Sequence, residues 1–261
     1  MTQPPDSTPT AIAPPGWTPA GQVPAIPPQT SQLWLISLAP APDTLDWCGR
    51  VLSDAEQARA RRFRFDRHRH AFIIARGWLR HLVGRHSGRP PCQVEFATNE
   101  FGKPFLTPAP SPALHFNLSH SDALALIAFT HDGETGVDIE KVRPEVMGER
   151  IAERFFSRPE VEALESLDPA QQAEGFFTCW TRKEAYIKAR GDGLYRSLDT
   201  FAVSLRPSDP PALLWSQDDE QAPARWKIWR LPAPDGFMAS LVSSAQTTTL
   251  QLLHPTHPLP D

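Results

Sequence analysis

Two short segments of this chain carry acidic and basic side chains at spacings that suit phosphate chemistry. Residues 136–140 read Gly-Val-Asp-Ile-Glu, and this alternation of apolar and acidic residues is typical of a β-strand. Because strand side chains alternate between faces, Asp138 and Glu140 share one face, with Cβ atoms roughly 7 Å apart. Two carboxylates placed in this way can hold one hard cation between them.

The second segment, residues 180–188, has the spacing of a helix. Trp180, Glu184 and Lys188 recur every four residues and therefore share one helix face. A third carboxylate and an ammonium group are thus expected side by side on a helix that an aromatic residue anchors. This combination of groups suits Mg²⁺ and a diphosphate.

Each of these patterns also has a plainer interpretation. Taken alone, Asp138 and Glu140 could be ordinary outward-facing residues of a half-exposed strand. Glu184 and Lys188 alone could form a helix-surface ion pair, which contributes only about 0.2–0.5 kcal/mol. Only their conjunction with further phosphate-binding groups favours a shared site.

Two other segments supply such groups. Residues 99–104 place Lys103 on a turn rich in Gly and Pro, where backbone amides and an ammonium can meet an anion. Residues 117–121 read Asn-Leu-Ser-His-Ser and end a predicted strand, so His120 could donate to a phosphate oxygen. An exposed turn lysine and a solvent-facing histidine are the alternatives.

The charge of the chain is unevenly distributed. The 261 residues have a net charge of −4, yet residues 50–89 contain eleven arginines and only three acids. Such a block attracts an anion, which could be a nucleotide, a nucleic acid or an acidic protein. On the helix predicted for this region, Arg69, Arg76 and Arg80 fall within about 40° of each other and would form a basic ridge. A plain solvated face is an equally good interpretation.

Cysteine usage and hydropathy indicate a cytoplasmic protein. The three cysteines are far apart and form no CxxC pair, which argues against a disulfide framework or a zinc site. No apolar run approaches membrane-spanning length, and the N-terminus lacks the pattern of a signal peptide. We therefore expect no membrane association.

The order of predicted elements indicates an α+β fold with two similar halves. Residues 1–30 contain nine prolines and one charge, so we expect a disordered tail. Residues 31–134 would form the N-terminal half, residues 135–250 the C-terminal half, and residues 251–261 a loose end. A helix is predicted to begin at Ser53, a second to run over about residues 66–84, and a helical region to span residues 144–190 with a break near Asp168-Pro169. Strands are predicted at 33–38, 94–96, 114–118, 124–129, 135–140, 201–205, 212–215, 226–231 and 236–242.

Three turn and cap signals refine this prediction. Ser53 followed by Glu56 has the spacing of a capping box at a helix start. Gly191 is placed to end the long helical region. The dipeptide Asp132–Gly133 predicts a tight hairpin between the strands on either side of it.

Together these motifs resemble the surfactin-type (Sfp-like) 4′-phosphopantetheinyl transferases. Five ordered motifs carry the resemblance, which covers about residues 33–245, and no single motif would be specific. They are Arg61-Arg62-Phe63, Gly102-Lys103-Pro104, Phe116 to Ser121, Gly136 to Glu140, and Trp180-x-x-Lys183-Glu184-x-x-x-Lys188 with Gly191-x-Gly193-Leu194.

The resemblance implies a fold, a reaction and a set of site residues. It implies two α+β halves related by a pseudo-twofold axis, with coenzyme A in the cleft between them. Mg²⁺ would be held by Asp138, Glu140 and Glu184, while Lys188 would meet the diphosphate. Coenzyme A would also be held by Arg59, Lys103, Ser119 and His120. The family often has a basic residue where Ala71 stands, so one nucleotide contact is either missing or supplied by a neighbour.

The implied reaction is Mg²⁺-dependent transfer of the 4′-phosphopantetheine arm from coenzyme A to a serine of an apo acyl- or peptidyl-carrier protein, with release of 3′,5′-ADP. Glu184 is the candidate base and, with Lys188, the candidate catalytic pair. We expect a monomer that binds no nucleic acid. A metal-dependent nuclease and a non-catalytic module that only captures carriers or nucleotides are the competing hypotheses.

Overall fold

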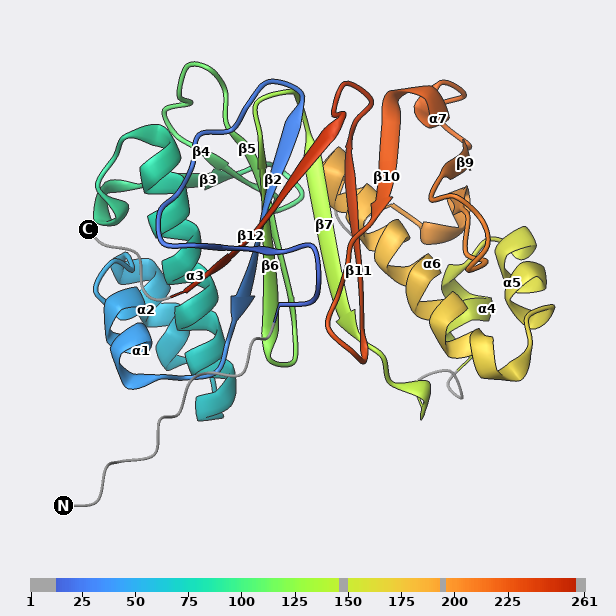
Figure 1. Cartoon of the computed structure of the whole chain (residues 1–261), viewed down its shortest axis with the longest axis horizontal. Coiled ribbons are helices and arrows are strands. Elements are labelled where there is room, and N and C mark those ends of the chain that lie inside the picture. The colour runs from blue at the N-terminus through green and yellow to red at the C-terminus, as the bar shows by residue number, and fades with distance from the viewer. Residues whose placement is uncertain (1–12, 146–149, 193–195, 257–261) are drawn as a thin grey trace.

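The computed structural model describes residues 13–145, 150–192 and 196–256. The fold is mixed α+β, with two main β-sheets at the centre and helices on both sides (Figure 1). Within the described ranges, no helix combines the length and the apolar character needed to cross a bilayer.

The larger sheet has five strands. Their order is β1 (Thr18–Ala20), β12 (Thr249–Pro255), β2 (Thr30–Ser37), β6 (Leu124–Thr130) and β5 (His115–Ser121). The helices beside this sheet are α1 (Pro42–Gly49), α2 (Asp54–Arg61) and α3 (Asp66–Ser87), on the left in Figure 1. A 3₁₀ turn, η1 (Pro91–Gln93), and a small ribbon of β3 (Phe96–Thr98) and β4 (Pro104–Leu106) complete this part.

The second sheet has three strands. Their order is β10 (Trp226–Arg230), β11 (Phe237–Ser244) and β7 (Thr135–Lys141). The helices of this part are α4 (Ile151–Phe155), α5 (Arg158–Glu165), α6 (Pro169–Arg190) and α7 (Ala222–Arg225). A 3₁₀ turn, η4 (Leu198–Thr200), precedes a second ribbon of β8 (Phe201–Val203) and β9 (Leu213–Ser216).

Strand alternation distributes the apolar residues among separate cores. On β2, Trp34 and Ile36 pack toward α1 and α3, whereas Leu33 and Leu35 point into a core shared by both sheets. Val137 and Ile139 of β7 both join that shared core, which confirms the prediction that they lie on one face of the strand. Asp138 and Glu140, the residues that alternate with them, therefore face away from the shared core.

Side-chain hydrogen bonds join the two sheets where strands β5 and β7 lie next to each other. The backbone amide of Val137 donates to Asn117 Oδ1 at 2.9 Å, and Ser119 Oγ donates to Asp138 Oδ1 at 2.7 Å. Backbone ladders pair β5 with β6 and β7 with β11, but not β5 with β7. The polar residues of segment 117–121 thus replace a backbone ladder at this seam.

Several sequence predictions are confirmed. The capping box of Ser53 and Glu56 is present at the start of α2, with both reciprocal hydrogen bonds. The second predicted helix is α3, which extends three residues beyond the predicted end. Gly191 ends α6 in the left-handed conformation with φ +79°.

The predicted Asp132–Gly133 hairpin is wrong. The segment does turn, but β6 pairs with β2 and β5, while β7 pairs with β11 of the other sheet. A turn dipeptide fixes the local change of direction, whereas the pairing partner depends on which apolar faces become buried together. Here the turn carries the chain from one sheet to the next.

The predicted ends of the folded region also need correction. Residues 1–12 lie outside the described part, but β1 pairs in parallel with β12, and Trp17 is buried and donates its indole N–H to Pro232 O at 2.9 Å. The loose end predicted from residue 251 is instead strand β12 as far as Pro255. A proline-rich segment can still order when it buries an aromatic ring and adds an edge strand.

Helix α6 packs against the backbone of β7 at Gly136. A Cβ atom added to this glycine would lie 2.1 Å from Ala185 O and 2.3 Å from Ala189 N, both on α6. No side chain fits in this space. The glycine of the 136–140 motif therefore sets the distance between the acidic strand and the long helix.

We predict that Gly136→Ala lowers the free energy of unfolding by about 3 kcal/mol or more, because the helix must move to admit the methyl group. Urea unfolding followed by circular dichroism measures the change. Gly49→Ala is the matched control, since its added Cβ would meet only Ile73 at 3.9 Å. Equal stability of the two variants would contradict direct packing of α6 on β7.

Candidate active site

A cavity of about 900 Å³ lies where β5, β7 and α6 meet. We call it the acidic cavity. It contains six of the eight site residues predicted from the sequence, contributed by elements of both predicted halves. These six are Ser119, His120, Asp138, Glu140, Glu184 and Lys188.

Helix periodicity brings the α6 residues to this cavity. Trp180, Glu184 and Lys188 all line it, as expected from their spacing of four residues. Trp180 is held by an edge-on contact with Phe155 and by stacking near Phe176, with ring centroids 5.8 Å and 6.1 Å away. Aromatic packing at one end of the face thus fixes the rotation of the helix about its axis.

Asp138 is the most enclosed acid of the site, at 1% exposure. Its Oδ1 accepts hydrogen bonds from Lys188 Nζ at 2.6 Å and from Ser119 Oγ at 2.7 Å. Its Oδ2 is buried and has no hydrogen-bond partner. A buried carboxylate oxygen without a partner is energetically unfavourable, so this oxygen is available for a cation or a donor on a ligand.

The pKa values of the other two acids, Glu140 and Glu184, are raised above those of a glutamate in water. Burial and the nearby charge of Asp138 raise the pKa of Glu140, although Ser121 Oγ donates to its Oε2 at 2.7 Å. Burial raises the pKa of Glu184 to about 7, and Asp138 and Glu140 act in the same direction while Lys188 opposes them. The acids therefore repel one another across the cavity, and a bound cation would relieve this repulsion.

These donors fit a hard divalent cation by their chemistry. Carboxylate oxygens are the ligands that Mg²⁺ prefers, and Asp138 offers an unpartnered one. Within the described ranges, no three His, Cys, Asp or Glu side chains already lie close enough together to form a metal site. The donor set is thus present, but it is not arranged as a coordination shell.

Groups that can donate hydrogen bonds to a phosphate lie beside the acids. Burial lowers the pKa of His120, and the charges of Lys188 and Arg59 lower it further, whereas Asp138 opposes the shift. Lys188 Nζ also lies 3.0 Å from Ser119 Oγ. A phosphate group bound here would meet an ammonium, a hydroxyl and an imidazole within one small region.

Arg59 and Lys103, the remaining predicted site residues, do not line the acidic cavity. Arg59 is exposed on α2 with its guanidinium 5.2 Å from the centre of the Phe72 ring, although its charge reaches His120. Lys103 forms an ion pair with Glu134 and donates to Ala189 O at 2.8 Å. Its side chain lines a separate cavity of about 270 Å³.

The predicted basic ridge on α3 is wrong. Arg80 is buried and bonds to Glu56, and Arg76 is paired with the same carboxylate. Both guanidinium groups also lie against the Phe96 ring. Helix geometry placed the arginines on one face correctly, but Arg76 and Arg80 pack inward around Glu56. Arg69 stays the most exposed of the three.

Sequence reasoning missed several residues that line the acidic cavity. Arg154 and Phe155 come from α4, and Arg196, Ser197 and Leu198 come from the segment before β8. These residues lie outside the quoted motifs, in short segments without a clear periodic pattern. Only the tertiary fold brings them to the site.

Lys183 belongs to the helix motif, but its side chain is buried and makes structural contacts. It is fully buried, 2.7 Å from Glu160 Oε2, and donates to the carbonyls of Leu198 and Phe201, also at 2.7 Å. These bonds hold η4 and the start of β8 against α6. Because Leu198 lines the acidic cavity, Lys183 also positions one wall of the site.

Comparisons with known proteins agree with these observations. Residues 134–242 match the family model described as the 4′-phosphopantetheinyl transferase superfamily. Residues 37–132 match the model described as 4′-phosphopantetheinyl transferase, N-terminal. The two matches meet close to the predicted boundary between the halves.

Two curated relatives are similar over more than half of the chain. The 4′-phosphopantetheinyl transferase HetI of Nostoc sp. is 40% identical over 210 residues, which are 80% of this chain and 85% of HetI. The 4′-phosphopantetheinyl transferase Sfp of Bacillus subtilis is 34% identical over 154 residues, covering 59% of this chain and 66% of Sfp. A crystal structure of a Bacillus anthracis holo-(acyl-carrier-protein) synthase in complex with CoA (3′,5′-ADP) matches 42% of this chain and 92% of its own, with 23% identity and a TM-score of 0.35.

We predict that Lys183→Met lowers the free energy of unfolding by about 3–5 kcal/mol, because Glu160 is left as a buried charge without a cation. Urea unfolding measures the loss. The double variant Lys183→Met/Glu160→Gln should regain part of the stability, since it removes that charge. Arg158→Met, which removes an exposed ion pair with Glu162, is the control and should change stability by less than about 1 kcal/mol. A single variant as stable as this control would contradict the interpretation.

Proposed function

This chain belongs to the 4′-phosphopantetheinyl transferase superfamily, and on that premise we propose that it transfers the 4′-phosphopantetheine arm of coenzyme A to a serine of an apo acyl- or peptidyl-carrier protein. In this reaction the serine oxygen forms a bond to the β-phosphorus of coenzyme A. The bond from that phosphorus to the α-phosphate breaks, and 3′,5′-ADP leaves.

The observation that carries the proposal is the acidic cavity itself. Asp138, Glu184 and Lys188 line one space, and Lys188 contacts Asp138 directly. A volume of about 900 Å³ is within the range of cofactor-sized ligand sites. Phosphoryl transfer requires carboxylates that bind a metal ion and accept a proton, and positive groups that bind the diphosphate. The cavity contains both kinds of group.

The side chains of the cavity divide the work of binding and proton transfer. Ser119 and His120 hold phosphate oxygens of coenzyme A by hydrogen bonds. Lys188 contacts a diphosphate oxygen and offsets the negative charge that grows on the departing phosphate. Glu184 accepts the proton of the attacking serine, which lets the oxygen form its new bond to phosphorus.

The proposed metal is one Mg²⁺ held by Asp138, Glu140 and Glu184, which would supply charge neutralisation of the diphosphate when bound. The unpartnered Asp138 Oδ2 and the mutual repulsion of the three acids support this assignment. Nucleotide contacts from Arg59 and Lys103 stay predictions. For Lys103 such a contact requires release from Glu134.

We also propose that the two halves, divided near residue 134, are related by a pseudo-twofold axis. Each contains one helix of 22 residues, α3 and α6, that ends at a left-handed glycine, Gly88 and Gly191. A single chain then supplies both walls of the cavity, so a monomer suffices for activity. The carrier protein is identified by mixing a panel of apo carriers with coenzyme A and measuring intact masses.

We predict that Glu184→Gln lowers kcat/KM by at least about 100-fold while the fold is retained, because the amide cannot accept the serine proton. Mass spectrometry of a carrier incubated with coenzyme A measures the transfer. Glu165→Gln, at an exposed acid on α5, is the control and should keep wild-type turnover. A Glu184→Gln enzyme within twofold of wild type would refute the assigned role.

We predict that EDTA abolishes transfer and that added Mg²⁺ restores it, because the diphosphate charge is then neutralised again. Calorimetric titration of Mg²⁺ in the presence of 3′,5′-ADP should show at least about tenfold weaker binding in Asp138→Asn. Asp122→Asn is the control, since Asp122 is exposed and paired with Lys141 outside the cavity. Full activity of the EDTA-treated enzyme would rule out the metal.

A further inference from the structure

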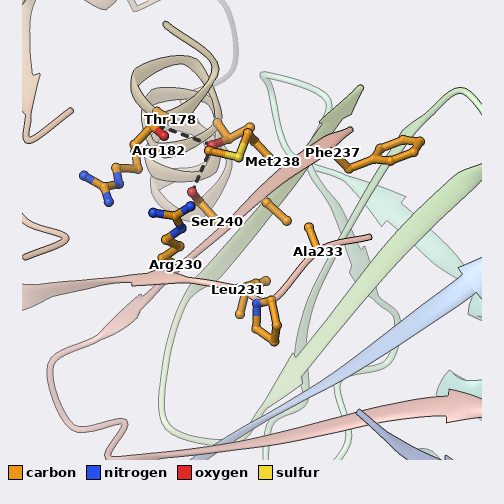
Figure 2. Close-up of a pocket in the computed structure, with 11 residues that line it drawn as sticks. Thr178, Arg182, Arg230, Leu231, Ala233, Phe237, Met238 and Ser240 are labelled. Carbon is orange, nitrogen blue, oxygen red and sulfur yellow. Dashed lines mark hydrogen bonds between the residues drawn. The ribbon is translucent and has the colours of Figure 1, made fainter. Parts of the chain in front are cut away.

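A second cavity, of about 230 Å³, lies between α6, β11 and the segment that follows β10 (Figure 2). We call it the arginine cavity. It shares no lining residue with the acidic cavity, so it is a separate place on the molecule. Its polar lining residues are Thr178, Thr181, Arg182, Arg230 and Ser240.

Arg182 is a buried cation to which no carboxylate is hydrogen-bonded in the described part of the chain. The residue is 2% exposed, and its Nη1 donates to Ser204 O at 2.5 Å and to Ser204 Oγ at 2.8 Å. Its Nε is buried and has no hydrogen-bond partner. Among the residues that the structure describes, no Asp or Glu forms an ion pair with it. A buried charge in this state is unfavourable unless a counter-ion is present.

Arg230 adds a second positive charge to the same cavity. In Figure 2 the two guanidinium groups lie toward the same end of the cavity, away from Phe237 and Ala233. Burial lowers the pKa of Arg182 to about 10, and the charge of Arg230 acts in the same direction, whereas Cys179 and Asp209 oppose the shift. Arg230 is half-exposed and bonds to Glu174 Oε1 at 2.8 Å through Nη2.

Hydroxyl groups provide further polar contacts. Thr181 Oγ1 lies 2.9 Å from Ser240 Oγ, and this pair connects α6 to β11. The remaining lining is apolar and includes Leu231, Pro232 and Ala233. The cavity therefore combines a cationic end and hydroxyl groups with an apolar floor, and none of its lining residues is acidic.

We propose that the arginine cavity binds a small free oxyanion of the size and charge of inorganic phosphate. Guanidinium groups bind tetrahedral oxyanions through parallel N–H donors, and Arg182 has such a donor unused. The oxyanion balances the charge of Arg182 and accepts hydrogen bonds from both arginines, while Arg230 keeps its ion pair with Glu174. A cavity of this size excludes a nucleotide, whose place is the larger acidic cavity.

The oxyanion would act on stability. Arg182 precedes Glu184 by two residues on α6, but it points to the other cavity. Binding therefore fastens α6 to the strand ends of β10 and β11. Because the oxyanion binds only the folded chain, it raises the melting temperature in proportion to the logarithm of its concentration.

The test is a phosphate titration followed by differential scanning fluorimetry at constant ionic strength, with chloride as the replaced anion and sulfate as a second probe. We expect the melting temperature of the wild type to rise with the logarithm of the phosphate concentration once that concentration exceeds the Kd. In Arg230→Gln the apparent Kd should rise at least about tenfold, because a charged donor is lost. Arg225→Gln, at an exposed arginine paired with Asp219, is the charge-matched control and should behave as the wild type.

Two further arms separate this site from other effects. Repeating the titration with saturating coenzyme A keeps phosphate out of the acidic cavity, and the stabilisation should persist. Ser240→Ala should weaken the phosphate effect without loss of the fold. Equal phosphate affinity in wild type and Arg230→Gln, or complete loss of the effect with coenzyme A, would overturn the proposal. Transfer activity of Arg230→Gln should stay at the wild-type level, so failure here is distinguishable from failure of the proposed function.

Discussion

The close contact between α6 and the backbone of β7 at Gly136 is the constraint on which the site depends. It brings a helix and a strand within the distance that lets Lys188 reach Asp138 at 2.6 Å. A side chain at position 136 would push α6 away from β7 and so separate Lys188 from Asp138. The same contact holds the acids of β7 next to Glu184. One missing Cβ atom thus links the packing of the C-terminal part to the chemistry of its cavity.

Local periodicity explains why much of the site was predictable. A period of two puts Asp138 and Glu140 on one strand face, and a spacing of four puts Glu184 and Lys188 on one helix face. Neither inference needs knowledge of the tertiary fold. That the two faces meet in one cavity was not contained in either period. It followed only from the resemblance of the ordered motifs to a known family, and the structure brings the faces together.

The predictions that failed involve partners distant in sequence. Arg80 was expected on an exposed ridge, but its partner Glu56 lies on another helix. The Asp132–Gly133 turn gave the correct reversal and the wrong pairing, because the neighbour of β7 is β11, far along the chain. Trp17 ordered a segment whose composition predicted disorder. In each case a buried tertiary contact outweighed a local signal.

The two buried cations of α6 show how differently a fold can treat adjacent charges. Lys183 has a carboxylate and two carbonyl oxygens within 2.7 Å, so its burial is offset inside the chain. Arg182, one residue earlier, has only Ser204 and an unpartnered Nε. If the interior were short of negative charge in general, both Lys183 and Arg182 would lack a partner for their charge. Of these two, only Arg182 lacks an ion-paired carboxylate among the described residues, and it is Arg182 that lines the arginine cavity together with Arg230. The missing counter-charge is therefore one that a small anion can supply by entering this cavity.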